Sequence, residues 1–117
     1  MPLEGREVVI VEAARTPIGR GHLEKGYYKD KHPNELLGAA YRAVVERAGI
    51  DPGEVENVIG GCVAQFGPQG LHIARNAWLQ QGFPIETSAT TIDLQCGSAQ
   101  QAVNLAASQI ASGVHDV

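Results

Sequence analysis

Short β-branched runs alternate with helical patterns three times along this chain, and that alternation constrains the fold more than any other feature. The β-branched runs predict strands over residues 8–11, 58–59 and 90–92. Apolar residues at helical spacing predict helices near residues 33–48, 71–81 and 97–112. A βαβαβα series implies an α/β fold with a mostly parallel sheet and right-handed crossover connections.

The helix ends carry recognisable signals. Pro33 suits the first turn of the first helix, and Gly49, Gly82 and Gly113 follow the three predicted helices where a left-handed residue is favoured. The segment 51–54, Asp-Pro-Gly-Glu, predicts a short turn closed by a capping box. The third helix has a face made mostly of alanine, which is typical of a helix that approaches other backbones closely or of an ordinary alanine-rich amphipathic helix.

Composition places the chain among ordinary globular domains. It has 117 residues, 44% of them hydrophobic and 19% charged, and this size allows a single domain with a core of its own. Glycine is abundant, with 14 residues, and aromatics make up only 5%, which indicates close backbone contacts and tight turns.

Charge and hydropathy narrow the function classes. A net charge of −4 argues against a general nucleic-acid binder. No apolar run reaches the roughly 20 residues of a membrane span, and the first residues lack a signal-peptide pattern, so we expect a cytoplasmic protein without membrane contact. Two cysteines are too few for a disulfide scaffold.

Cys96 is the residue with the sharpest chemical implication. It falls where the predicted strand 90–92 ends and the next helix begins, and ligands of α/β proteins bind beyond such strand ends. Unpaired N–H groups and the helix dipole favour an anion there, so the thiolate, which is the nucleophilic form, is favoured. Gly97 leaves room for a substrate. Spacing alone leaves two interpretations open, a nucleophile and an inert buried thiol.

Other candidates carry weaker signals. Cys62 follows Gly60-Gly61 and is expected to be a core or supporting residue; a disulfide with Cys96 is not expected in a reducing compartment. His72 is interpreted as a loop or surface histidine, and Arg75 either binds an anion or forms a structural ion pair. The four histidines show no metal-ligand spacing. The segment 19–24 lacks the third glycine of a dinucleotide-binding loop. This segment belongs to a long connection, residues 15–32, and a connection of this length is either functional or mobile.

Several segments together resemble the N-terminal part of a thiolase. They are residues 9–19, 48–52, 58–63 and 73–75 and the segment 95–102, Gln-Cys-Gly-Ser-Ala-Gln-Gln-Ala. The last is similar to the nucleophile segment of actinobacterial thiolases of steroid degradation. It departs from the Ala-Ser-Gly that many members have after the cysteine, and His72 stands where the family usually has Asn.

The resemblance implies a fold, a mechanism and partners. The fold is a three-layer αβα arrangement with a mixed, mostly parallel sheet of order 3-2-1-4-5, here incomplete. Cys96 is implied as the catalytic nucleophile of thiolytic cleavage or Claisen condensation of 3-ketoacyl-CoA, with no cofactor and no metal, and with coenzyme A as a substrate. CoA-binding residues are not assigned.

The family's further catalytic residues belong to its C-terminal half. We therefore expect residues 1–117 to be a partial N-terminal domain, inactive alone, that works in a homo-oligomer or with a complementing C-terminal thiolase chain. Two alternatives stay open: a non-catalytic thiolase-like module that binds a partner or lipid, and a related condensing enzyme such as a ketoacyl synthase.

Overall fold

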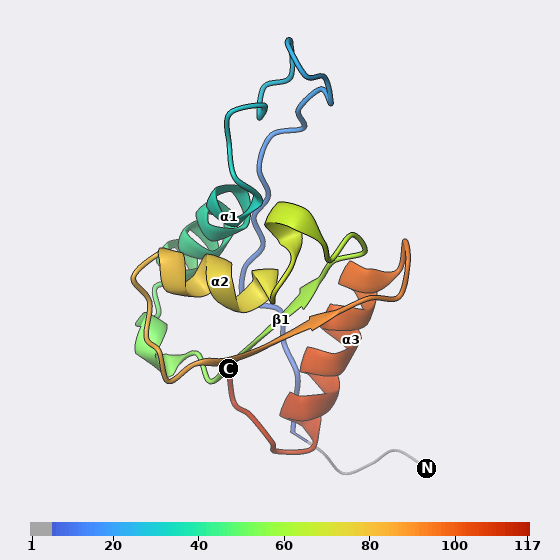
Figure 1. The fold of residues 1–117 in the computed structure, drawn as a ribbon. Coiled ribbons are helices and arrows are strands. Elements are labelled where there is room, and N and C mark those ends of the chain that lie inside the picture. Colours follow the sequence, from blue (N-terminus) through green and yellow to red (C-terminus); the bar gives the residue numbers. More distant parts are fainter. Residues whose placement is uncertain (1–5) are drawn as a thin grey trace.

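The computed structural model describes residues 6–117, and the elements follow the predicted alternation from the first helix onward (Figure 1). Each predicted helix is present, and two of the three predicted strands form. In chain order the elements are α1 (Pro33–Ala48), η1 (Pro52–Glu54), β1 (Asn57–Gly61), η2 (Gly67–Gln69), α2 (Ile73–Gln80), β2 (Ser88–Ile92) and α3 (Ser98–Ala111). None of the helices within residues 6–117 has the length and apolar character needed to cross a bilayer.

The two strands form a parallel pair with a register that runs from Asn57 opposite Ser88 to Gly61 opposite Ile92. Figure 1 shows α1 and α2 on one side of this pair and α3 on the other, so the layers are helix, sheet and helix. This arrangement is an incomplete αβα fold of the predicted class.

Two adjacent glycines at the end of β1 allow the helices on both faces to come close. A Cβ on Gly60 would lie 2.8 Å from the Cβ of Ala74 in α2. A Cβ on Gly61 would lie 2.4 Å from the carbonyl carbon of Ser98 in α3. Successive strand residues face opposite sides of a sheet, so each glycine serves a different helix. The close backbone contacts predicted from the glycine content are therefore present.

The core is built around Trp78, which is 2% exposed. Its ring packs against Tyr41 and Phe83 at centroid distances of 5.9 and 4.6 Å, and its Nε1 donates to the Pro84 carbonyl at 2.9 Å. This bond satisfies the one polar group that a buried indole brings with it. The remaining buried apolar residues are small or β-branched: Val45, Ile73, Ala74, Ala77 and Ala102.

The prediction of a strand over residues 8–11 is wrong for this structure. The segment forms no ladder, and Ile10 is 82% exposed. A run of β-branched residues favours a strand only when neighbouring strands and helices bury it on both faces. Within residues 6–117 the segment has β1 as its single possible strand neighbour and no strand for its other edge. The predicted pairing of the first two strands is absent, whereas that of the second and third is present.

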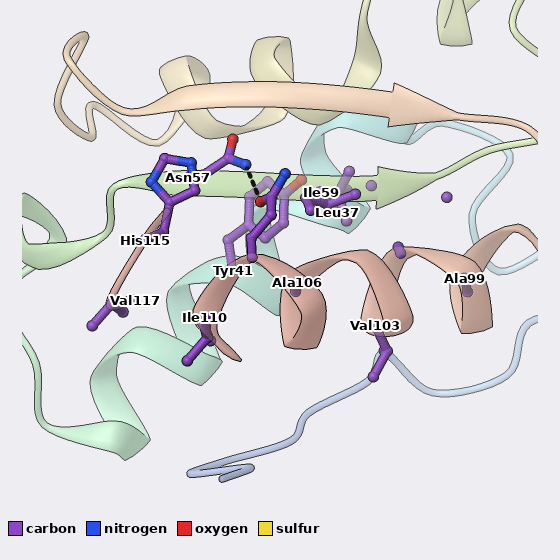
Figure 2. Close-up of a pocket in the computed structure, with 14 residues that line it drawn as sticks. Leu37, Tyr41, Asn57, Ile59, Ala99, Val103, Ala106, Ile110, His115 and Val117 are labelled. Atoms are coloured by element: carbon purple, nitrogen blue, oxygen red, sulfur yellow. Dashed lines mark hydrogen bonds between the residues drawn. The ribbon is translucent and has the colours of Figure 1, made fainter. Parts of the chain in front are cut away.

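The free edge of β1 borders an apolar groove of about 360 Å³ between α1 and α3 (Figure 2). Leu37 and Tyr41 line it from α1, Ile59 from β1, and Val103 and Ile110 from α3. The groove therefore lies beside the strand edge that the segment 8–11 was expected to cover.

The connection 15–32 projects from the body of the molecule (Figure 1). Internal contacts hold its shape: the Tyr28 hydroxyl donates to the Pro17 carbonyl, and the Tyr28 ring packs on Gly19. His22 Nδ1 accepts from the backbone N–H groups of Glu24 and Lys25 at 3.1 and 3.0 Å. These bonds give the connection a defined conformation.

Candidate active site around Cys96

The connection from β2 to α3 is a tight turn of five residues, 93–97, and Cys96 is exposed within it. Asp93 Oδ1 accepts from the Gln95 N–H at 2.8 Å, and the Gly97 N–H donates to the Leu94 carbonyl at 3.0 Å. Gln95 has a φ of 49°, which is a left-handed conformation that costs a residue with a side chain about 1 kcal/mol or more. The turn thus carries Cys96 from the carboxyl end of a strand directly to the start of a helix, where the sequence places it.

Ser98 fixes the geometry of this turn. Its side chain is buried, and its Oγ accepts from the Leu94 N–H at 2.9 Å and donates to the Gln95 carbonyl at 2.6 Å. The sequence pattern shows Ser98 only as a polar residue within an alanine-rich helix. A serine in the first turn of a helix, two residues after a candidate nucleophile, is the signal that could have identified it.

The start of α3 follows directly after the thiol, and the N–H groups of Gly97 and Ser98 there already donate to the Leu94 and Gln95 carbonyls at 3.0 and 3.1 Å. Gly97 is the N-cap residue, and it supplies no side-chain cap to the first turn. The N–H groups of such a turn carry a partial positive charge that favours an anion, such as a thiolate or an oxyanion. No hydrogen bond joins the Cys96 thiol to a side-chain base within residues 6–117.

Cys62 occupies the matching position at the end of β1. Its N–H donates to the Ile92 carbonyl at 2.9 Å, which extends the ladder, and its half-buried Sγ accepts from Gln69 Nε2 at 3.6 Å. It lines a cavity of about 450 Å³ together with Arg15, and Cys96 is not among the residues that line this cavity. Both cysteines are free thiols. The packing agrees with a supporting role for Cys62.

His72 is held by the sheet. Its Nδ1 lies 2.8 Å from Thr91 Oγ1, and its Nε2 lies 3.0 Å from the Ala89 carbonyl oxygen. Thr91 Oγ1 also accepts from the Ala74 N–H at 3.2 Å, so a hydroxyl from β2 caps the first turn of α2. His72 thus lies in the turn before α2, as the loop alternative expects, and its half-buried side chain is bonded to a strand distant in the sequence.

Arg75 bonds to backbone carbonyls and forms no ion pair with a carboxylate within residues 6–117. Its Nη2 donates to the Ile85 carbonyl at 2.9 Å, and its Nη1 donates to the Thr87 carbonyl. The structural ion pair predicted as one alternative is absent from the described residues; instead the guanidinium holds the backbone that leads into β2.

The fold agrees with the comparisons with known proteins. Residues 8–117 match the family model described as thiolase, N-terminal domain, and the chain belongs to this family. It is 41% identical, over 95% of its length, to the steroid 3-ketoacyl-CoA thiolase FadA6 of Mycobacterium tuberculosis. It is 39% identical, over all of its length, to a 3-ketoacyl-CoA thiolase of Saccharophagus degradans.

A solved structure gives the same result for the fold. The crystal structure of the Bacillus anthracis acetyl-CoA acetyltransferase superposes with a TM-score of 0.72 at 39% identity, over 77% of this chain and 23% of that one. The chain spans 26% and 30% of the length of the two curated relatives named above. The family resemblance and the incomplete thiolase fold predicted from the sequence are confirmed.

Proposed function

We propose that this chain supplies the acyl-carrying cysteine of a thiolase-type acyltransferase, which performs thiolytic cleavage or Claisen condensation of 3-ketoacyl-CoA. The observation that carries the proposal is the position of Cys96, exposed at the start of α3 in a chain that matches the thiolase N-terminal domain over residues 8–117. The names of the relatives, which are 3-ketoacyl-CoA thiolases and an acetyl-CoA acetyltransferase, support this reaction class.

In the cleavage direction the Cys96 thiolate attacks the 3-keto carbon of the substrate. The bond between C2 and C3 then breaks, its electron pair forms the enolate of acetyl-CoA, and a proton converts this enolate to acetyl-CoA. The shortened acyl group stays on sulfur as a thioester. The thiol of a second CoA loses its proton and attacks this thioester, so that a shortened acyl-CoA leaves and the Cys96 thiolate is regenerated.

Each attack develops an oxyanion, and the chain offers groups suited to it. The partial positive charge at the start of α3 favours a negative charge beside Cys96, and preorganised N–H donors stabilise such charges most when they do not have to reorient. Gly97 lacks a Cβ that would hinder an approaching thioester. The bonds of the Ser98 hydroxyl to Leu94 and Gln95 hold the turn before Cys96 against the start of α3.

The chemistry also needs a base and an acid. Because no side-chain base is bonded to Cys96 within residues 6–117, we propose that this part of the enzyme works with further thiolase residues, in a homo-oligomer or with a complementing chain. Acyl-CoA and CoA are the proposed small-molecule partners. The same observation favours the second candidate, a thiolase-like module that binds without chemistry.

A two-stage experiment distinguishes these candidates. The chain is combined with a complementing C-terminal thiolase chain, incubated with acetyl-CoA, desalted and analysed by peptide mass spectrometry, and then exposed to free CoA. The proposal expects an acetyl thioester on the Cys96 peptide that CoA removes, with release of acetyl-CoA. Cys96→Ser abolishes the adduct and Cys62→Ser keeps it. If the chain binds acetyl-CoA but no adduct forms, the non-catalytic module is the better account.

A further inference from the structure

We propose that His72 is a positioning residue for Cys96, which acts by anchoring the last residues of β2, from which the Cys96 turn starts. The inference rests on the proposed function of Cys96. It concerns a histidine to which the sequence analysis assigns no catalytic role. Contacts between segments that are distant in the chain make the connection.

The first step is the backbone of His72. It has a φ of 75° and a ψ of 63°, and Leu71 before it has a φ of 52°. Two successive left-handed residues with side chains cost about 1–2 kcal/mol each, and they persist only where other contacts hold them. Histidine and asparagine are among the few side-chain-bearing residues enriched in this region.

The second step is the pair of bonds that the imidazole makes to β2. A carbonyl can only accept, so His72 Nε2–H donates to the Ala89 oxygen, and Nδ1 is left as the acceptor for the Thr91 hydroxyl. The Thr91 oxygen still accepts from the Ala74 N–H. Each polar atom in this cluster has a partner of the opposite kind, which defines one arrangement of α2 against β2.

The third step leads from this cluster to the thiol. Thr91 is followed by Ile92, whose carbonyl accepts from the Cys62 N–H at 2.9 Å. Of the last two residues of β2, Thr91 is therefore bonded to the start of α2, and Ile92 is bonded to the end of β1. The turn begins at the next residue. Within it, the Gln95 N–H donates to Asp93 Oδ1, and the Leu94 N–H donates to Ser98 Oγ. Cys96 is thereby linked to α2 through the backbone of residues 91–95, which hydrogen bonds hold at several points.

The two requirements explain which residues fit position 72. The residue has to tolerate a left-handed backbone, and it has to offer both a donor and an acceptor to β2. Asparagine meets the first requirement and places its amide oxygen near the position of Nδ1, within reach of Thr91. Glycine meets the first requirement alone. Alanine meets neither.

The test compares His72→Asn, His72→Gly and wild type by amide hydrogen exchange. The inference expects exchange at Leu94 and Gln95 to be about tenfold faster in His72→Gly, and within about twofold of wild type in His72→Asn. Glycine removes the imidazole without adding backbone strain, so this variant folds. Exchange at Val45, which is buried in α1, is the control and stays unchanged. Thr91→Val removes the hydroxyl at nearly constant shape and should act like His72→Gly.

A second readout connects the anchor with chemistry. The rate of Cys96 acetylation by acetyl-CoA should fall about fivefold in His72→Gly and recover in His72→Asn, a rescue that a purely structural role would not produce. Unchanged exchange at Leu94 and Gln95 in His72→Gly overturns the inference, whatever the acetylation shows. A wild-type chain that is never acetylated even with a complementing C-terminal thiolase chain present, but shows the expected exchange pattern, refutes the proposed function and leaves the anchoring role supported.

Discussion

Replacing Gly61 with alanine should displace the start of α3 and destabilise the chain. The new Cβ would lie 2.4 Å from the Ser98 carbonyl carbon, 2.5 Å from the Ala99 nitrogen and 2.6 Å from the Ser98 oxygen. Ordinary contact begins near 3.4 Å, so the helix start has to move by about 1 Å. All three atoms belong to the backbone, and no side-chain rotation can relieve the clash.

Overpacking of this kind lowers the free energy of unfolding by about 1–3 kcal/mol. Because the clash is with backbone, we expect Gly61→Ala to cost about 2 kcal/mol. With a urea m-value of about 1.5 kcal/mol per M, the unfolding midpoint should fall by about 1.3 M. Equilibrium urea unfolding followed by circular dichroism measures this shift. Because Ser98 holds the Cys96 turn, the acetylation rate of Cys96 should fall as well.

Gly21→Ala is the matched control, because a Cβ added there would meet nothing within 4 Å and the φ of Gly21 is not left-handed. Its midpoint should change by less than about 0.3 M, which corresponds to about 0.5 kcal/mol. Equal midpoints for Gly61→Ala and Gly21→Ala would refute the close contact between β1 and α3, and with it the reasoning that places the Cys96 turn.

Three further substitutions test other parts of the structure. Ile10→Asn should change the free energy of unfolding by less than about 0.5 kcal/mol, because Ile10 is 82% exposed; a loss of about 2 kcal/mol or more in urea unfolding would mean that the segment 8–11 is buried as a strand. Trp78→Phe should cost about 2 kcal/mol by the same assay, since it removes the bond to the Pro84 carbonyl and part of the buried ring; a cost near zero would contradict the described core. Burial raises the pKa of Tyr41 above its usual value near 10, so the folded state holds that proton more tightly than the unfolded state, and the stabilisation present below pH 10 is lost as the pH rises above it. Wild type should therefore lose about 1 kcal/mol more than Tyr41→Phe between pH 8 and pH 11, and parallel losses in the two proteins would contradict the burial of this phenol.

Local signals in the sequence were sufficient for most of the elements. Gly49 adopts the predicted left-handed conformation after α1, with a φ of 69°, and Asp51 and Glu54 form the predicted capping box. These features depend on residues within one or two turns of each other. The predicted start of α2 lies two residues too early, because Leu71 and His72 have left-handed backbones that no local pattern indicates.

Long-range contacts explain what the sequence did not reveal. The segment 8–11 has the composition of an inner strand, but strand formation depends on neighbours that a single run of residues does not specify. Arg75 donates to backbone carbonyls of the segment that leads into β2, and His72 donates to a backbone carbonyl within β2. Every residue has a backbone carbonyl, so the sequence does not indicate which carbonyl a side chain binds. The position of Cys96 was predictable because both the strand before it and the helix after it were.

The acyl acceptor itself is the most direct test. Wild-type chain is incubated with acetyl-CoA in the presence of a complementing C-terminal thiolase chain, and the acetylated fractions of the Cys96 and Cys62 peptides are compared over time. We predict that acetyl accumulates on Cys96 toward one group per chain while Cys62, half-buried and bonded to Gln69, stays unmodified. Acetyl distributed equally between the two cysteines, or found on Cys62 alone, would contradict the assignment of Cys96 as the acyl-carrying residue.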